Sequence, residues 1–248
     1  MLKKISIITV CMNSEKTIMR CLKSVHNQNY PKNKIEHIVI DGKSSDKTVS
    51  IINKFKKKIK YFESKKDKGI YYAINKALKK CSGDIIGVLN SDDYYYKNTF
   101  RIVSKYFMAQ KLDFLFGSVN HKRLYHGFYP KKIWYKLNIY PSHSVSFFIK
   151  KKTQLQMGFY NTQIKYSSDR DLIYKLIRKN RLGLASRKNE VFGKFNTQGI
   201  SSKLDKFTTL RDEYKVRYNN KQNSFFIIIL LIVRYVYSYL IQLINSKK

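Results

Sequence analysis

Four short runs of apolar, mostly β-branched residues alternate with helical patterns in the first 90 residues, and this alternation restricts the fold more than any other feature. The runs are Ile5–Val10, Ile35–Ile40, Ile59–Phe62 and Ile85–Leu89. The apolar spacing between them predicts helices over Glu15–Asn27, Asp46–Lys56 and Ile70–Lys80. Strands separated by helices form βαβ units with right-handed crossovers. We therefore expect an α/β fold with a mainly parallel central sheet and flanking helices.

The ends of these runs are the places to look for chemistry, because ligands of open parallel sheets bind beyond the carboxyl ends of the strands. Asp41 ends the second run, and Gly42 after it permits a tight turn. The Asp41 carboxylate could accept hydrogen bonds from a base or ribose, or it could brace the turn. The first run lacks the glycine-rich loop of a dinucleotide-binding or P-loop enzyme, which disfavours both classes.

A pair of adjacent carboxylates, Asp92 and Asp93, follows the fourth run. Hard oxygen ligands at such a strand end suit Mg²⁺ or Mn²⁺ shared with a diphosphate, since these cations keep waters and take up phosphate oxygens. The alternative is that the pair caps the next helix. Acidic residues are scarce in this chain, so a pair at a strand end favours a metal site.

The chain is strongly basic: 248 residues carry 50 Lys and Arg against 16 Asp and Glu, a net charge of +34. This charge favours a polyanionic partner, either nucleic acid or an anionic lipid surface, unless the lysines are simply solvated. No zinc finger, RNP or KH motif is present, so we expect no nucleic-acid partner. Three cysteines without C-x-x-C spacing indicate a reducing, cytoplasmic compartment.

The motifs of residues 1–115, taken in order, resemble the nucleotide-sugar half of a family 2 glycosyltransferase with the GT-A fold. The matching stretches are Ser6–Val10 with Asn13, Ile38–Thr48, Asp67–Tyr71 with Ala73 and Asn75, and Gly83–Asp93. In residues 116–220, the resemblance continues in Pro141–Ile149, which looks like the family's strand after the metal site. It continues again in Ser167–Leu172, which looks like the start of the acceptor-side helix.

The resemblance implies a metal-dependent, inverting transfer from a nucleoside-diphosphate sugar, with a UDP-sugar as the expected donor, to a hydroxyl of a glycan or lipid-linked acceptor. It implies Asp169 as the catalytic base, and Asp93 and Asp92 as ligands of Mn²⁺ or Mg²⁺. The donor-site residues that it implies are Thr9, Asn13, Glu15, Asp41, Asp67, Gly69 and Asp92. The alternative for Asp169 is a cap of the helix over residues 170–179. A sugar nucleotidyltransferase is disfavoured because its glycine-rich first loop is missing.

The C-terminal segment is apolar without interruption over residues 225–233, and the pattern continues to Ile244. Arg234 at its midpoint disfavours a membrane span. A polar stripe of Arg234, Ser238, Gln242 and Asn245 predicts an amphipathic helix in the membrane interface. Packing on the protein itself or on a second copy of the chain, as a homodimer, is the alternative. We therefore expect a glycosyltransferase domain over 1–220 and a membrane-associating helix over 221–248, peripheral to the inner face of the cell membrane.

Overall fold

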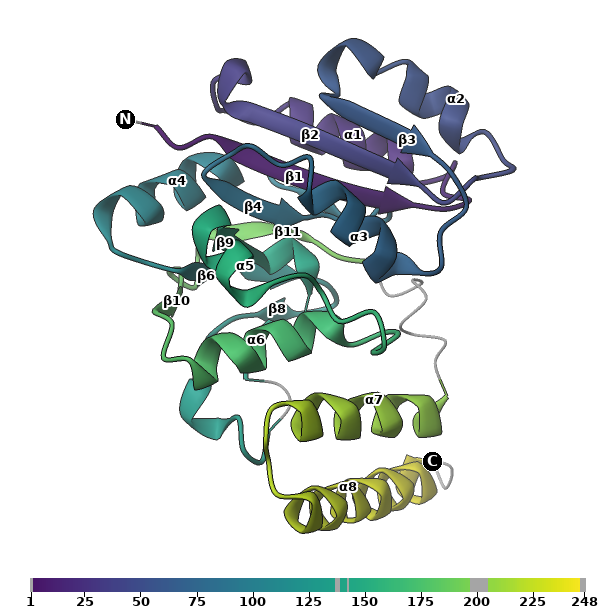
Figure 1. The fold of residues 1–248 in the computed structure, drawn as a ribbon, viewed down its shortest axis with the longest axis vertical. Coiled ribbons are helices and arrows are strands. Elements are labelled where there is room, and N and C mark those ends of the chain that lie inside the picture. The colour runs from purple at the N-terminus through teal and green to yellow at the C-terminus, as the bar shows by residue number, and fades with distance from the viewer. Residues whose placement is uncertain (1, 137–138, 142, 197–204, 246–248) are drawn as a thin grey trace.

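A seven-stranded mixed sheet forms the centre of the computed structural model, which describes residues 2–136, 139–141, 143–196 and 205–245 (Figure 1). From edge to edge its strands are β10 (Gly183–Ala185), β6 (Phe114–Phe116), β9 (Phe147–Lys150), β4 (Ile85–Val88), β1 (Ile5–Cys11), β2 (Ile35–Asp41) and β3 (Tyr61–Ser64). Neighbours are parallel except at β9, which is antiparallel to both β4 and β6. The expected mainly parallel sheet is confirmed, and the four predicted runs overlap β1 to β4.

Helices cover both faces of this sheet. The helices of the described residues are α1 (Ile18–His26), α2 (Thr48–Asn53), α3 (Ile70–Leu78), α4 (Thr99–Ala109), α5 (Lys151–Met157), α6 (Ser168–Arg178), α7 (Lys206–Asn219) and α8 (Ser224–Asn245). The last two lie away from the sheet (Figure 1). Short 3-10 turns lie at Lys32–Lys34, Lys56–Lys58, Pro130–Lys132 and Ser144–Ser146. The helix expected from Glu15 begins only at Ile18, because Glu15 is held by the loop that follows β2.

A second, four-stranded sheet has the order β5 (Tyr94–Tyr95), β11 (Val191–Lys194), β7 (Ser118–Asn120) and β8 (Leu124–Tyr125). Its pairing of β5 with β11 joins the segment directly after Asp93 to the second half of the chain. Gly193 makes this approach close: a Cβ there would lie 2.2 Å from the carbonyl oxygen of Tyr94. Through the pairing of β5 with β11, the second sheet thus fixes the position of Asp92 and Asp93 relative to residues 116–196.

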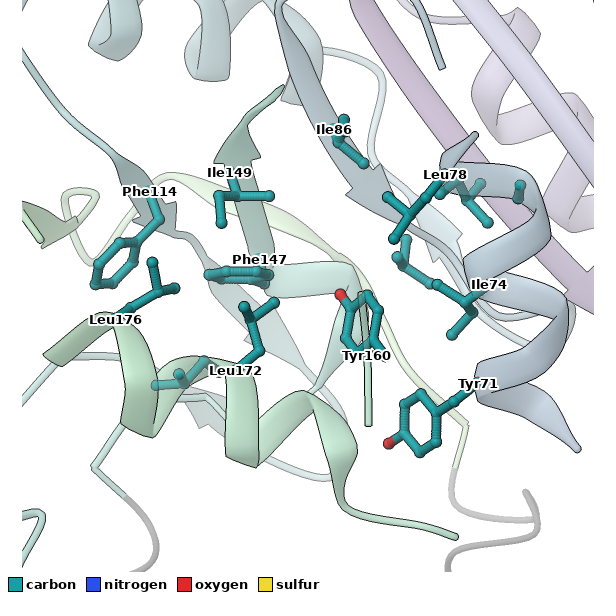
Figure 2. Close-up of a cluster of buried hydrophobic side chains, with 14 of the residues drawn as sticks. Tyr71, Ile74, Leu78, Ile86, Phe114, Phe147, Ile149, Tyr160, Leu172 and Leu176 are labelled. Carbon is teal, nitrogen blue, oxygen red and sulfur yellow. The ribbon is translucent and has the colours of Figure 1, made fainter. Parts of the chain in front are cut away.

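Apolar side chains of successive strand residues point to opposite faces of the main sheet, where they form two large hydrophobic clusters and a smaller third one between β1, β2, α1 and α2. On one face, α3 packs mainly over β1 and β2, and α6 lies over β6 and β9 (Figure 2). Ile74, Leu78, Leu172 and Leu176 point toward the strand residues Ile86, Phe147 and Ile149 (Figure 2). On the other face, α1 and α4 cover the sheet with residues such as Val25, Phe100 and Val103. Helix α6 is therefore fixed to the sheet through its apolar side, which leaves its first turn to face α3.

The last two helices, α7 and α8, lie side by side at one end of the molecule (Figure 1). Glu213 of α7 is buried and forms ion pairs with both Arg217 of the same helix and Arg234 of α8. Ile227 is fully buried as well. The expected C-terminal helix is confirmed, but Arg234 binds α7 rather than lying on a water-facing stripe. The side chains of Ser238, Gln242 and Asn245 lie outside the described residues.

Most of the remaining described surface of α8 is apolar and exposed. The exposed side chains are Phe225, Phe226, Ile228, Ile229, Ile232, Val233, Tyr235, Val236, Tyr237 and Tyr239. A search of the described residues finds no helix with the length and hydropathy that crossing a bilayer requires.

Candidate active site

The segments that follow β1, β2 and β4 meet at the carboxyl edge of the main sheet. Cys11 at the end of β1 is paired with Asp41 at the end of β2. The hydroxyls of Ser14 and Ser91 lie 2.8 Å apart, which joins the loop after β1 to the loop after β4. Parallel strands bring their carboxyl ends together in this way, so the sequence-predicted donor residues and the aspartate pair share one edge.

Asn13 and Glu15 connect the loops that follow β1 and β2. The Asn13 side-chain oxygen accepts a hydrogen bond from the backbone N–H of Ser45 at 2.9 Å, and Glu15 accepts one from the N–H of Lys47 at 3.0 Å. Asn13 has a φ of +49°, a conformation that asparagine tolerates better than most residues. In this structure both side chains therefore shape the rim of the site by holding two loops together.

Asp41 is fully buried and already saturated by protein donors. Its carboxylate accepts hydrogen bonds from the Ser44 N–H at 2.9 Å, the Ser44 hydroxyl at 2.5 Å and the Ser64 hydroxyl at 2.6 Å. This is the turn-bracing arrangement, and a base that reads Asp41 would have to replace one of these hydroxyls.

Thr9 also lies inside the protein. Its hydroxyl has no exposed surface and is 3.0 Å from Nε2 of His37. Burial lowers the pKa of His37 well below its usual range, so this contact involves a neutral imidazole. The structure therefore places Thr9 in the packing between β1 and β2, where its side chain has no surface to offer a donor.

Asp67 and Gly69 lie directly before α3. Asp67 forms an ion pair with Lys76 at 2.7 Å, and its second carboxylate oxygen is buried without a hydrogen-bond partner among the described residues. Gly69 has a φ of +144°, which disfavours any residue with a side chain. In the turn before α3, Lys76 thus binds one carboxylate oxygen of Asp67, and the second oxygen has no hydrogen bond to a described residue.

Asp92 and Asp93 lie between β4 and β5. Asp93 is buried, and one of its oxygens accepts the backbone N–H of Asn196 at 3.0 Å. The other oxygen is buried 3.8 Å from Nδ1 of His143 and has no hydrogen bond to any residue that the structure describes. Burial, and then the negative charge of Asp93, raises the pKa of Asp92 to about 6. Two crowded carboxylates, of which Asp92 has the raised pKa, form a site that a cation would stabilise.

The two aspartates fit a divalent cation that is shared with a phosphate ligand. No group of three or more acidic, His or Cys side chains in the described ranges could hold a metal alone. Mg²⁺ in nucleotide sites needs only one or two carboxylates, since waters and phosphate oxygens complete its shell. The unpartnered oxygen of Asp93 and the crowded Asp92 match that requirement.

Asp169 lies in the first turn of α6, and Tyr71 of α3 binds it. The Tyr71 hydroxyl donates to the Asp169 carboxylate at 2.9 Å and accepts from the Asp169 backbone N–H at 3.3 Å. The Asp169 carboxylate makes no capping bond with a described residue at the start of α6, so the alternative role as a helix cap is not observed. Asp171 points elsewhere, to Lys175 and Asn220, as expected for two acids on different sides of a helix.

The sequence did not indicate two of these contacts. Tyr71 lies inside the matched stretch Asp67–Tyr71, but nothing in that stretch indicated a contact with Asp169. Asn196 binds Asp93 through its backbone, which no side-chain pattern can reveal.

Comparison with known proteins settles the family. The model described as Glycosyl transferase family 2 matches residues 6–172, more than half of the chain. The chain belongs to glycosyl transferase family 2. The resemblance seen in the motifs is thereby confirmed, and the matched range includes every sequence-predicted site residue.

Curated relatives match a part of this family 2 protein. The "Dolichyl N-acetyl-alpha-D-glucosaminyl phosphate 3-beta-D-2,3-diacetamido-2,3-dideoxy-beta-D-glucuronosyltransferase" of Methanococcus voltae is 39% identical over 95 residues, which cover 36% of this chain and 29% of that protein. The "Poly(ribitol-phosphate) beta-N-acetylglucosaminyltransferase TarS" of Staphylococcus aureus is 35% identical over 101 residues, 40% of this chain and 18% of that protein. The matches thus span less than a third of either relative.

Solved structures extend the likeness to almost the whole family 2 chain. The S. aureus TarS 1-349 structure in complex with UDP-GlcNAc has a TM-score of 0.71 at 21% identity and covers 92% of this chain and 70% of that one. The mannosyltransferase PcManGT from Pyrobaculum calidifontis, in complex with GDP-Man and Mn²⁺, has a TM-score of 0.70 at 15% identity and covers 93% and 68%. At these identities the likeness shows the fold, and the expected GT-A glycosyltransferase fold is confirmed.

Proposed function

We propose that this protein transfers a sugar from a nucleoside-diphosphate donor, a UDP-sugar in the first instance, to a hydroxyl of a glycan or lipid-linked acceptor. The transfer inverts the anomeric carbon. The main support is the hydrogen bond between Asp169 and Tyr71, because it places a carboxylate of the acceptor half against the helix that begins at the donor-half turn Asp67–Gly69. Base and donor segments that are 98 residues apart in sequence are thereby neighbours.

In the proposed reaction Asp169 removes the proton from the acceptor hydroxyl. The acceptor oxygen forms a bond to the anomeric carbon while the bond from that carbon to the diphosphate oxygen breaks, and the nucleoside diphosphate leaves with the electron pair. General-base assistance of this kind contributes about 10²- to 10⁴-fold to a rate. Asp169 is half-buried, and its second carboxylate oxygen is available for this step because Tyr71 occupies only the first.

Asp92 and Asp93 would hold Mg²⁺ or Mn²⁺ in this proposal. A cation bound there supplies charge neutralisation to the departing diphosphate. Asp93 is the stronger ligand candidate, since one of its oxygens is buried without a hydrogen bond to the described part of the chain. A metal is also present in the GDP-Man complex of PcManGT, although that likeness concerns the fold alone.

We further propose that the protein works at an anionic membrane surface, which it reaches through α8. The support is a run of exposed apolar and aromatic side chains on a helix that α7 anchors through Glu213 and Arg234, in a chain of net charge +34. Such a helix inserts its apolar face at the headgroup boundary while the positive charge attracts acidic lipids. A lipid-linked acceptor would be met at that surface.

The decisive experiment measures donor binding and turnover with the full-length protein. A panel of UDP-, GDP- and dTDP-sugars is screened by thermal shift with Mn²⁺, with Mg²⁺ and with EDTA, and each hit is then tested for release of the nucleoside diphosphate. We expect stabilisation by one nucleotide class only when a divalent cation is present. Stabilisation by no nucleotide sugar, together with binding of nucleic acid, would reject the proposal in favour of the alternative class.

A further inference from the structure

The Tyr71 hydroxyl uses all of its usual hydrogen-bonding directions on one residue of the opposite half of the chain. It donates to the side chain of Asp169 and accepts from the backbone N–H of the same residue. In Figure 2 the Tyr71 hydroxyl points from α3 toward the beginning of α6. A side chain that merely filled space between two helices would not need to bind both the carboxylate and the backbone of one acid.

Packing around Tyr71 fixes the position of this hydroxyl. The Tyr71 ring is buried and stacks on the Tyr160 ring, with centroids 5.5 Å apart and an angle of 18° between the planes (Figure 2). Asn75, one turn further along α3, holds the backbone of Tyr160 through two hydrogen bonds of 2.8 and 2.9 Å. The ring therefore has little freedom to turn away from Asp169.

The chemical state of the phenol suits a permanent donor. Burial, and then the charge of Asp169, raises the pKa of Tyr71 well above its usual range. The proton therefore stays on the Tyr71 oxygen throughout the neutral range and is directed at Oδ1 of Asp169. The second oxygen, Oδ2, receives no hydrogen bond from a described residue and remains available as an acceptor.

We propose that Tyr71 is a positioning residue for the base: it fixes Oδ1 and the first turn of α6, and so presents Oδ2 of Asp169 to the acceptor hydroxyl. This inference rests on the proposed function of Asp169. Because Tyr71 follows Gly69 by two residues, the same turn of α3 borders the predicted donor pocket and orients the base. The geometry points to one rigid element that serves both substrates.

The test compares Tyr71→Phe with Tyr160→Phe in the full-length protein. Each change removes one phenolic hydroxyl from the same stacked pair, but only the first removes a hydrogen bond to Asp169. A hydrogen bond to a charged group accounts for about 10- to 100-fold in an equilibrium or rate. We expect Tyr71→Phe to lower kcat by about that factor with an unchanged Kd for the nucleotide sugar, and Tyr160→Phe to retain most of kcat.

The pH profile separates positioning from a general structural effect. Without the phenolic donor the ionised carboxylate is less stabilised, so the acidic limb of the kcat profile should move to higher pH in Tyr71→Phe and stay in place in Tyr160→Phe. Incorporation of 3-fluorotyrosine at position 71 makes the hydroxyl a stronger donor and should move the limb to lower pH. This second variant keeps the ring shape, so it also serves if Tyr71→Phe does not fold.

An unchanged kcat and pH profile in the position 71 variants would overturn the inference, provided that Asp169→Asn abolishes transfer. Full transfer by Asp169→Asn would instead reject the proposed base itself. A combined Tyr71→Phe and Asp169→Asn variant should be no slower than Asp169→Asn alone, because residues that act through one another do not have additive effects. A further loss in the combined variant would count against positioning.

Discussion

Arg234 of α8 forms an ion pair with the buried carboxylate of Glu213 in α7, which in turn binds the fully buried Arg217. One acid thus holds two cations from two helices. The pair joins the C-terminal helix to the rest of the protein and leaves the apolar side chains of α8 exposed around it.

Removal of this contact should loosen α8. We expect Arg234→Met to lower the free energy of unfolding by about 1 to 3 kcal/mol, less than for a fully buried pair because Arg234 is about one third exposed. Urea unfolding followed by circular dichroism measures the change. Arg211→Met, which removes an exposed arginine of α7, is the matched control and should be close to neutral. Equal stability of both variants would mean that packing alone holds α8.

The metal proposal predicts that Asp93→Asn abolishes cation-dependent nucleotide binding. The amide keeps the shape of the side chain and can still accept the Asn196 hydrogen bond, but it removes the charge that a cation needs. Isothermal titration of UDP with and without Mn²⁺ measures the loss. UDP binding that is equally strong in EDTA would remove the metal from the site.

The base proposal predicts that Asp169→Asn leaves the Kd of the nucleotide sugar unchanged and lowers kcat by about 10²- to 10⁴-fold. The carboxylate contacts the acceptor hydroxyl and not the donor in the proposed geometry. Asp171→Asn is the neighbouring comparison: its carboxylate is buried against Lys175 and Asn220, so this change should reduce stability rather than donor-saturated turnover. The opposite pattern would exchange the roles of the two acids.

The raised pKa of Asp92 predicts a pH-dependent stability in the metal-free protein. Folded Asp92 has a pKa of about 6 against about 4 for an unfolded aspartate, so the folded state holds the proton more tightly between these values. The contribution of Asp92 to the free energy of unfolding is therefore greatest below pH 4, and it is lost as the pH rises to 6. In EDTA, Asp92→Asn should therefore melt at a higher temperature than the native protein at pH 8, and the difference should shrink toward pH 5. A difference that does not vary with pH would contradict this assignment.

If α8 attaches the protein to membranes, acidic substitutions on α8 should weaken vesicle binding more than acidic substitutions elsewhere on the surface. Ile232→Glu combined with Val233→Glu should reduce sedimentation with phosphatidylglycerol vesicles by about tenfold or more, because two exposed apolar side chains of the inserted face become acidic. Met108→Glu combined with Leu155→Glu makes the same change at exposed positions on α4 and α5 and should have a smaller effect. Equal losses would assign the binding to overall charge rather than to α8.

The strands β1, β2 and β4 were predictable from sequence because each is a short, mostly β-branched run that is buried on both faces. The resemblance also implied a strand in Pro141–Ile149, which overlaps β9, but the apolar run of β9 carries no sign that it pairs antiparallel between two strands that precede it. The short strands of the second sheet, such as β8 with two residues, are too short to leave a pattern at all.

Within the candidate site, the motifs predicted which loops meet but not how each side chain is used. The resemblance implied that Asp41 reads a base with Thr9 near it, and the structure adds that both side chains are buried against neighbouring side chains. Burial of a polar residue depends on partners far along the chain, such as Ser64 for Asp41. The spacing of residues within a motif does not predict such partners. The hydrogen bond from Tyr71 to Asp169 could not be predicted for the same reason.

The antiparallel strand β9 also bears on how the chain must fold during synthesis. Its residues insert between β4 and β6 although both of those strands have been made earlier, so the facing edges of β4 and β6 stay unpaired until residue 150 has emerged. Unpaired strand edges associate with other chains. A fragment that ends at residue 115 would therefore be prone to aggregate, and the nucleotide-sugar half should be exchanged between relatives only together with the strand that closes it.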